Sequence, residues 1–161
     1  MHFSCRPVNA SFLDTAPMRF VTAVDLEASP AKVFAIFADA DSWPKWFHAI
    51  HKAVWTSEKP YGVGSTRTIW MTPVSVDEHF FRWEQDRRCS FYAAGTSTPL
   101  AHALAEDYLL EETAPGKTRF TYTVALDPRF LVEAGGPFSH MFFESMFKSA
   151  CEGLQSYVLQ V

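Results

Sequence analysis

The segment Ser29–Trp46, SPAKVFAIFADADSWPKW, and the turn YGVGSTR at residues 61–67 carry most of the information about the fold. Ser29 can cap a helix that begins at Pro30, because its side-chain oxygen accepts an otherwise unpaired amide and proline has no amide to leave unpaired. Three apolar side chains then share one helical face: Val33, Phe34 and Phe37. The segment therefore predicts a helix at residues 30–38.

Alternating apolar and polar residues, broken by turn residues, predict a strand-rich chain around this helix. Strands are predicted at residues 20–27, 52–57, 65–72, 74–84, 89–95, 102–110 and 120–126, and a second short helix at residues 44–50. The long segment Phe138–Leu159 has apolar side chains at spacings of three and four residues, as an amphipathic helix does. A meander of antiparallel strands must bury one face, and this final helix offers the only large apolar surface left. The sequence predicts an α+β fold in which an antiparallel sheet grips a long C-terminal helix.

The order of these elements and the spacing of several motif residues resemble the START-like, or SRPBCC, superfamily, in particular its polyketide cyclase/dehydrase and lipid-transport branch. The matching residues are Ser29, Pro30, Val33, Phe34, Asp39, Trp43, Pro44, Trp46, Gly62, Val63, Gly64, Ser65 and Arg67, with weaker agreement at Glu78, at Arg87 and Arg88, and at residues 105–110. The resemblance implies a helix-grip fold: a curved sheet around the C-terminal helix, two short helices after the first strand, and a mostly apolar cavity between sheet and helix. It implies no single activity, because members of this branch place different chemistry, or none, in the cavity.

The length of 161 residues fits one domain. The resemblance assigns residues 18–161 to a START-like domain. Residues 1–17 are then expected to be a mobile or disordered arm, a segment packed on a neighbour, or the product of a misassigned start codon, with Met18 as the true start.

Composition argues against several classes of partner. The formal net charge is −4 and the basic residues are scattered, so we expect no nucleic-acid binding. No apolar run reaches the roughly 20 residues of a membrane-spanning helix, so no integral membrane association is expected. The three cysteines have no metal-ligand spacing, which favours reduced thiols in the cytoplasm. We expect no metal and no cofactor, because His48 and His51 lack a third ligand nearby and no nucleotide-binding motif occurs.

Three polar residues are candidates for catalysis. Regular alternation would project His102, Glu106 and Tyr108 from one strand toward the same side as Leu104 and Leu110. Such a row could supply a base, an acid and a phenol donor to a carbonyl-bearing ligand. The alternative is that His102 and Glu106 lie in solvent or pair with an arginine near the strand end. A single bulge would also reverse which side these residues face.

Other residues are candidates for ligand binding. Arg67 and Glu78 occupy matched positions in neighbouring predicted strands, where they could form a structural ion pair or hold the polar end of a ligand, and Arg82 is a weaker candidate for the same role. The cavity that the resemblance implies would be lined by Tyr122, Phe143, Met146 and Phe147. The connector at residues 127–137 contains Phe130 and Leu131, which would form either an apolar lid or part of a fixed connector.

Three functions remain open at this level. The first is binding of a small hydrophobic or amphipathic molecule, such as a lipid, polyketide, isoprenoid or aromatic metabolite. The second is a cyclase or dehydratase that uses polar cavity residues, so whether the protein is an enzyme is left undecided. The third is an interaction module related to START-like domains that assist chaperones, although the final helix begins with Gly136-Pro137-Phe138 instead of the Gly-Trp pair of those domains. Both a monomer and a homodimer are compatible with the sequence.

Overall fold

A computed structural model describes all residues from 1 to 161. The helical elements are α1 (Phe12–Thr15), α2 (Pro30–Ala38), the 3-10 turn η1 (Ala40–Ser42), α3 (Trp43–Trp46), α4 (Phe130–Ala134) and α5 (Gly136–Tyr157). The strands are β1 (Phe3–Ser4), β2 (Met18–Leu26), β3 (Ile50–Trp55), β4 (Thr66–Met71), β5 (Val74–Glu84), β6 (Arg88–Thr96), β7 (Ala101–Ala114) and β8 (Lys117–Pro128). The predicted order of elements is therefore confirmed from β2 to α5.

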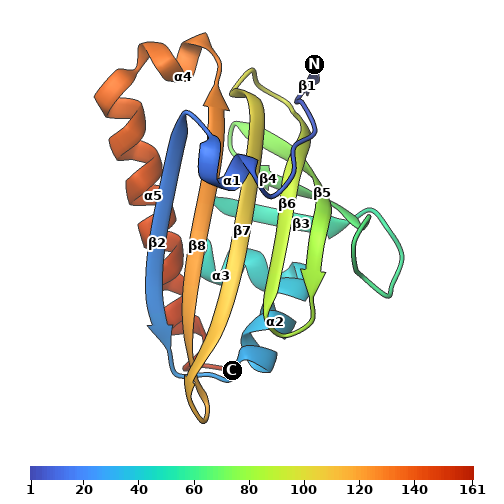
Figure 1. The fold of residues 1–161 in the computed structure, drawn as a ribbon, viewed down its shortest axis with the longest axis vertical. Coiled ribbons are helices and arrows are strands. Elements are labelled where there is room, and N and C mark those ends of the chain that lie inside the picture. Colours follow the sequence, from blue (N-terminus) through green and yellow to red (C-terminus); the bar gives the residue numbers. More distant parts are fainter.

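The eight strands form one curved antiparallel sheet, in which seven follow the order β2-β8-β7-β6-β5-β4-β3 and β1 pairs with β6. Figure 1 shows α5 and α3 behind this sheet and α1 in front of it. The sheet curves around α5, which packs against β2 along one edge. The helix-grip fold is thus confirmed.

The main core fills the space between the inner face of the sheet and helices α2, α3 and α5. Ser29 caps α2 as expected, accepting a hydrogen bond from the Lys32 amide at 3.3 Å. Among the residues buried in this core are Phe34, Phe37, Trp43, Trp46, Phe120, Phe147 and Leu154. Burying this many large aromatic side chains is the main source of stability, because each removes a large apolar area from water.

The second predicted helix is shorter than expected. The sequence predicted a helix at residues 44–50, whereas α3 ends at Trp46 and Phe47 is already extended. Ile50 begins β3 and pairs with Met71 of β4. The chain therefore leaves the helix after Trp46 and joins the sheet at Ile50.

The N-terminal residues pack on the convex face of the sheet instead of forming a mobile arm. β1 pairs with the end of β6, and the Cys5 and Arg6 amides donate to the carbonyls of Ala94 at 3.0 Å and His102 at 2.7 Å. Phe12 and Leu13 of α1 pack on three alanines of the outer face: Ala103, Ala105 and Ala125. These small side chains let α1 approach the sheet closely. Residues 3–6 lie in the gap that opens where β6 and β7 stop pairing with each other.

Candidate functional site

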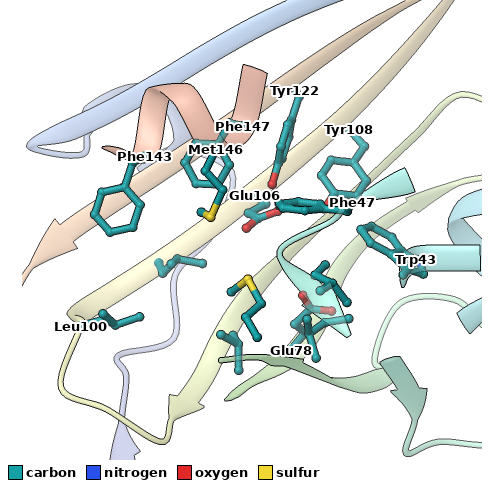
Figure 2. A pocket seen from close by; sticks show the side chains of 15 residues that line it. Trp43, Phe47, Glu78, Leu100, Glu106, Tyr108, Tyr122, Phe143, Met146 and Phe147 are labelled. Atoms are coloured by element: carbon teal, nitrogen blue, oxygen red, sulfur yellow. Dashed lines mark hydrogen bonds between the residues drawn. The ribbon is translucent and has the colours of Figure 1, made fainter. Parts of the chain in front are cut away.

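A narrow apolar cavity lies between the inner face of the sheet and the first half of α5 (Figure 2). The cavity volume is about 60 Å³, so the cavity is small as well as narrow. Thirteen of its 15 lining residues are hydrophobic, so the two that are not stand out as polar points in an apolar wall. The hydrophobic lining consists of Trp43, Phe47, Ile50, Ile69, Met71, Val76, Leu100, Leu104, Tyr108, Tyr122, Phe143, Met146 and Phe147.

Glu106 is one of the two polar points, and two phenols hold its carboxyl group. Glu106 and Tyr108 are two residues apart on β7 and so face the same side, and Tyr122 lies opposite Tyr108 on β8. The Tyr108 hydroxyl donates to Glu106 Oε2 at 2.9 Å, and the Tyr122 hydroxyl donates to the same oxygen at 2.8 Å. Figure 2 shows the carboxyl group between these rings and Met146. The other oxygen, Oε1, is left without a protein donor on the cavity side.

This environment changes the acidity of Glu106. Burial raises the pKa of its carboxyl to about 7, the neighbouring Glu78 carboxylate adds to the rise, and the hydrogen bonds from Tyr122 and Tyr108 oppose it. Burial, with the Glu106 charge next in effect, also raises the pKa of both phenols well above the usual value. Glu106 therefore changes protonation state near neutral pH while the two tyrosines remain proton donors.

Glu78 is the other polar point, and it is paired with Arg67. The two residues lie opposite each other on β5 and β4, as predicted, with Arg67 Nε 2.6 Å from Glu78 Oε2. Both side chains are buried, at 1% and 6% exposure. Arg67 also donates to the Phe37 carbonyl at 3.3 Å, and its guanidinium lies 4.3 Å from the centre of the Trp43 ring. Burial raises the pKa of the Glu78 carboxyl, and the charge and hydrogen bond of Arg67 counteract this.

Only one member of this pair borders the cavity. Glu78 is a lining residue, whereas Arg67 lies behind it among aromatic rings. The Arg67 Nη2 atom is buried without a hydrogen-bond partner. Arg67 thus neutralises Glu78 from outside the lining and does not itself contact the cavity.

Arg82 is not in the cavity, contrary to the prediction. The pairing of β5 with β6 shifts register between Phe80 and Arg82, which changes the alternation of side chains at this point. Arg82 instead lies 3.6 Å from the buried Asp107 carboxylate, which also accepts from Arg88 at 2.9 Å and from the Ser90 hydroxyl at 2.6 Å. Asp107 follows Glu106 on β7 and therefore faces the opposite, convex side.

His102 is also outside the cavity, so its predicted inward orientation is corrected. The pairing of β7 with β8 is irregular between Ala101 and Ala103, and His102, the residue between them, is exposed. At this point the Arg6 amide donates to the His102 carbonyl, where β7 no longer pairs with β6. Glu106 and Tyr108 keep the predicted orientation because they lie beyond this bulge.

The connector before α5 contains a short helix and places its two candidate residues in solvent. Phe130 and Leu131 on α4 are 77% and 67% exposed, whereas Val132 is buried. With His102 they border a separate surface depression. Neither of them lines the cavity between the sheet and α5.

The remaining predicted residues, Tyr122, Phe143, Met146 and Phe147, all line the cavity. Further lining residues, which no sequence pattern indicated, lie on β3, β4 and β5, at Phe47 and at Leu100. Leu104 also lines the cavity, and its alternation with Glu106 is the signal in the sequence that indicates this. Trp43 was expected to serve core packing; it is buried in the core and also borders the cavity.

None of the helices combines the length and the apolar composition needed to cross a membrane. No group of three or more His, Cys, Asp or Glu side chains is arranged to hold a metal ion.

Known proteins resemble this chain both in sequence and in structure. The family model described as polyketide cyclase/dehydrase and lipid transport matches residues 17–156. Uncharacterized proteins of Mycobacterium tuberculosis and Mycobacterium bovis are 40% identical over 124 residues, which cover 76% of this chain and 74% of each relative.

Solved structures share the fold at low sequence identity. A START superfamily protein from Mycobacterium smegmatis superposes with a TM-score of 0.75 at 12% identity, covering 88% of this chain and 97% of the other. The di-domain ARO/CYC BexL from the BE-7585A biosynthetic pathway gives a TM-score of 0.72 at 15% identity, covering 88% of this chain and 46% of the other. The match to the family model over residues 17–156 establishes that this chain belongs to the polyketide cyclase/dehydrase and lipid transport family.

Proposed function

We propose that the protein binds a small hydrophobic or amphipathic molecule in the cavity between the sheet and α5. The observation that carries the proposal is the lining itself, which is apolar except for two carboxyl groups whose polar partners come from the protein. Ligand sites of this kind have apolar walls with a few placed polar groups that fix orientation. Lipids, polyketides, isoprenoids and aromatic metabolites all have surfaces that suit such a wall.

Native mass spectrometry of gently purified protein, followed by denaturing extraction and identification of released molecules, tests this proposal. A matched pair of variants on α5 locates the site: Met146 lines the cavity, and Met141 is exposed on the same helix. Met146→Trp is expected to fill the cavity and abolish a bound adduct, whereas Met141→Trp should retain it. An adduct that survives Met146→Trp would place the ligand elsewhere and contradict the proposal.

A second candidate function is a cyclase or dehydratase-like reaction, which the environment of Glu106 favours. A carboxyl group with a pKa of about 7 can donate and accept a proton near neutral pH, and Tyr108 and Tyr122 are donors beside it. In this proposal Glu106 is the acid or base and Tyr108 a positioning donor; the exposed His102 has no contact with them. Loss of turnover of a carbonyl-bearing substrate in Glu106→Gln, with binding retained, would support it. Equal turnover in the variant would exclude Glu106 from the role.

The cysteines support a proposal for the compartment. Cys5, Cys89 and Cys151 are all buried and unpaired. Free thiols persist in a reducing environment, so we propose the cytoplasm. Fractionation of the native host tests this, and recovery outside the reducing compartments would contradict it.

A further inference from the structure

The hydrogen-bonding inventory of the cavity side chains limits the ligands that it can take. Each donor among these side chains is already used within the protein. The Tyr108 and Tyr122 hydroxyls both donate to Glu106 Oε2, and the indole of Trp43 donates to the Phe37 carbonyl at 3.0 Å. Arg67 donates its Nε to Glu78 Oε2, and its unpaired Nη2 belongs to a side chain that lies outside the lining.

What remains on the cavity side is a set of acceptors. Glu78 and Glu106 each engage Oε2 with protein donors and leave Oε1 free. An ionised carboxylate is an acceptor only, and the methionine sulfurs of Met71 and Met146 are weak acceptors. Figure 2 shows both carboxyl groups at the cavity, Glu106 from β7 and Glu78 from β5. A ligand that carries only acceptors would therefore leave these oxygens unpaired.

The negative charge of Glu106 also argues against a ligand that can only accept hydrogen bonds. Arg67 offsets Glu78, but Glu106 has only neutral phenols as partners. A carboxylate or phosphate ligand would meet this negative charge in a poorly solvated space, where repulsion is stronger than in water. When Glu106 is ionised, an anionic ligand is thus disfavoured both by this charge and by the lack of a free donor among the lining side chains.

We propose that the ligand is an apolar molecule whose polar end is a hydrogen-bond donor, a hydroxyl or an amine, received by the free carboxyl oxygens of Glu106 and Glu78, and that carboxylates are rejected while Glu106 is ionised. The inference rests on the proposed binding function and specifies its ligand class.

Four probes with one apolar body test the proposal by calorimetric titration of the full-length protein: 4-butylbenzyl alcohol, 4-butylbenzylamine, 4-butylbenzyl methyl ether and 4-butylbenzoate. The titrations are made at pH 8.5, where Glu106 is ionised. The alcohol and the amine are expected to bind about tenfold more tightly than the ether, which lacks a donor, as one hydrogen bond to a charged group implies. Of the four probes, 4-butylbenzoate should bind most weakly.

Variants assign the preference to the carboxyl groups. Glu106→Gln and Glu78→Gln should each reduce the advantage of the alcohol over the ether, while Glu112→Gln, at an exposed position of the same strand as Glu106, should leave it unchanged. The four titrations of the wild-type protein test the preference for a donor even if a variant fails to fold. Binding of benzoate as tight as that of the alcohol, or equal binding of alcohol and ether, would overturn the inference while leaving the binding function intact. Failure of all four probes, the neutral ether included, would count against the binding function itself.

Discussion

Glu78 and Glu106 border the same apolar cavity, but their partners differ in charge. Glu78 accepts from the Arg67 guanidinium, and Glu106 accepts from two neutral phenols. A positive charge stabilises an ionised carboxylate directly, whereas phenols contribute hydrogen bonds without a countercharge. The comparison suggests that Glu78 mainly belongs to the scaffold and that Glu106 is the group whose charge can change during function.

The largest expected effect comes from removing the charge partner of Glu78. Arg67→Met should lower the free energy of unfolding by about 3–5 kcal/mol, because it leaves a buried carboxylate unpaired. Urea denaturation measures this loss, and the double change Arg67→Met with Glu78→Gln should recover part of it. Arg119→Met is the control: its partner Asp25 is exposed, so a loss below about 1 kcal/mol is expected. If Arg67→Met were as mild as the control, the pair would not be the structural element described above.

Glu106 should make stability depend on pH in a definite direction. Its pKa of about 7 in the folded protein exceeds the usual 4.5, so the folded state holds a proton that the unfolded state has lost between these values. The contribution of Glu106 to stability is therefore fully present below about pH 4.5, declines as the pH rises toward about 7, and is absent above it. The difference amounts to about 3 kcal/mol.

Glu106→Gln removes this titration. The variant should gain stability relative to the wild type as the pH is raised from 5 to 8, measured as the difference in denaturation free energy at each pH. Glu112→Gln, exposed on the same strand, should track the wild type. A constant difference between Glu106→Gln and wild type across this range would mean that Glu106 has an ordinary pKa.

A smaller effect is expected from removing one phenol. Tyr122→Phe deletes a hydrogen bond to the Glu106 carboxyl and should cost about 2 kcal/mol at pH 8, where the group is ionised. Since this hydrogen bond lowers the pKa of Glu106, the pKa should rise in the variant, which carboxyl-carbon NMR titration would detect. Tyr92→Phe is a suitable control, because Tyr92 packs in the outer cluster. An unchanged pKa in Tyr122→Phe would show that the phenol does not stabilise the carboxylate.

The smallest effect is expected at His102. His102→Ala should change the free energy of unfolding by less than about 0.5 kcal/mol, because the side chain is exposed. Affinity for cavity probes should also be unchanged. A strong loss of turnover or binding in this variant would mean that the cavity extends to the surface depression beside α4.

The sequence was sufficient for parts of both the fold and the site. Ser29 and Pro30 marked the start of α2, and regular alternation placed Glu106, Tyr108 and Tyr122 on inward faces. The same alternation failed at His102 and Arg82, where the pairing with the neighbouring strand shifts register. The periodicity of one strand contains no information about such shifts, because they are a property of its pairing with another strand.

The sequence by itself determined the order of elements and the cross-strand meeting of Arg67 with Glu78, since both depend on spacing along the chain and between adjacent strands. Only the tertiary structure decided that both phenols converge on one oxygen of Glu106, that Arg67 stays behind the cavity wall, and that a register shift in β7 leaves His102 exposed. These features depend on sheet curvature and on contacts between residues far apart in sequence, which set burial, and burial in turn raises the pKa of Glu106.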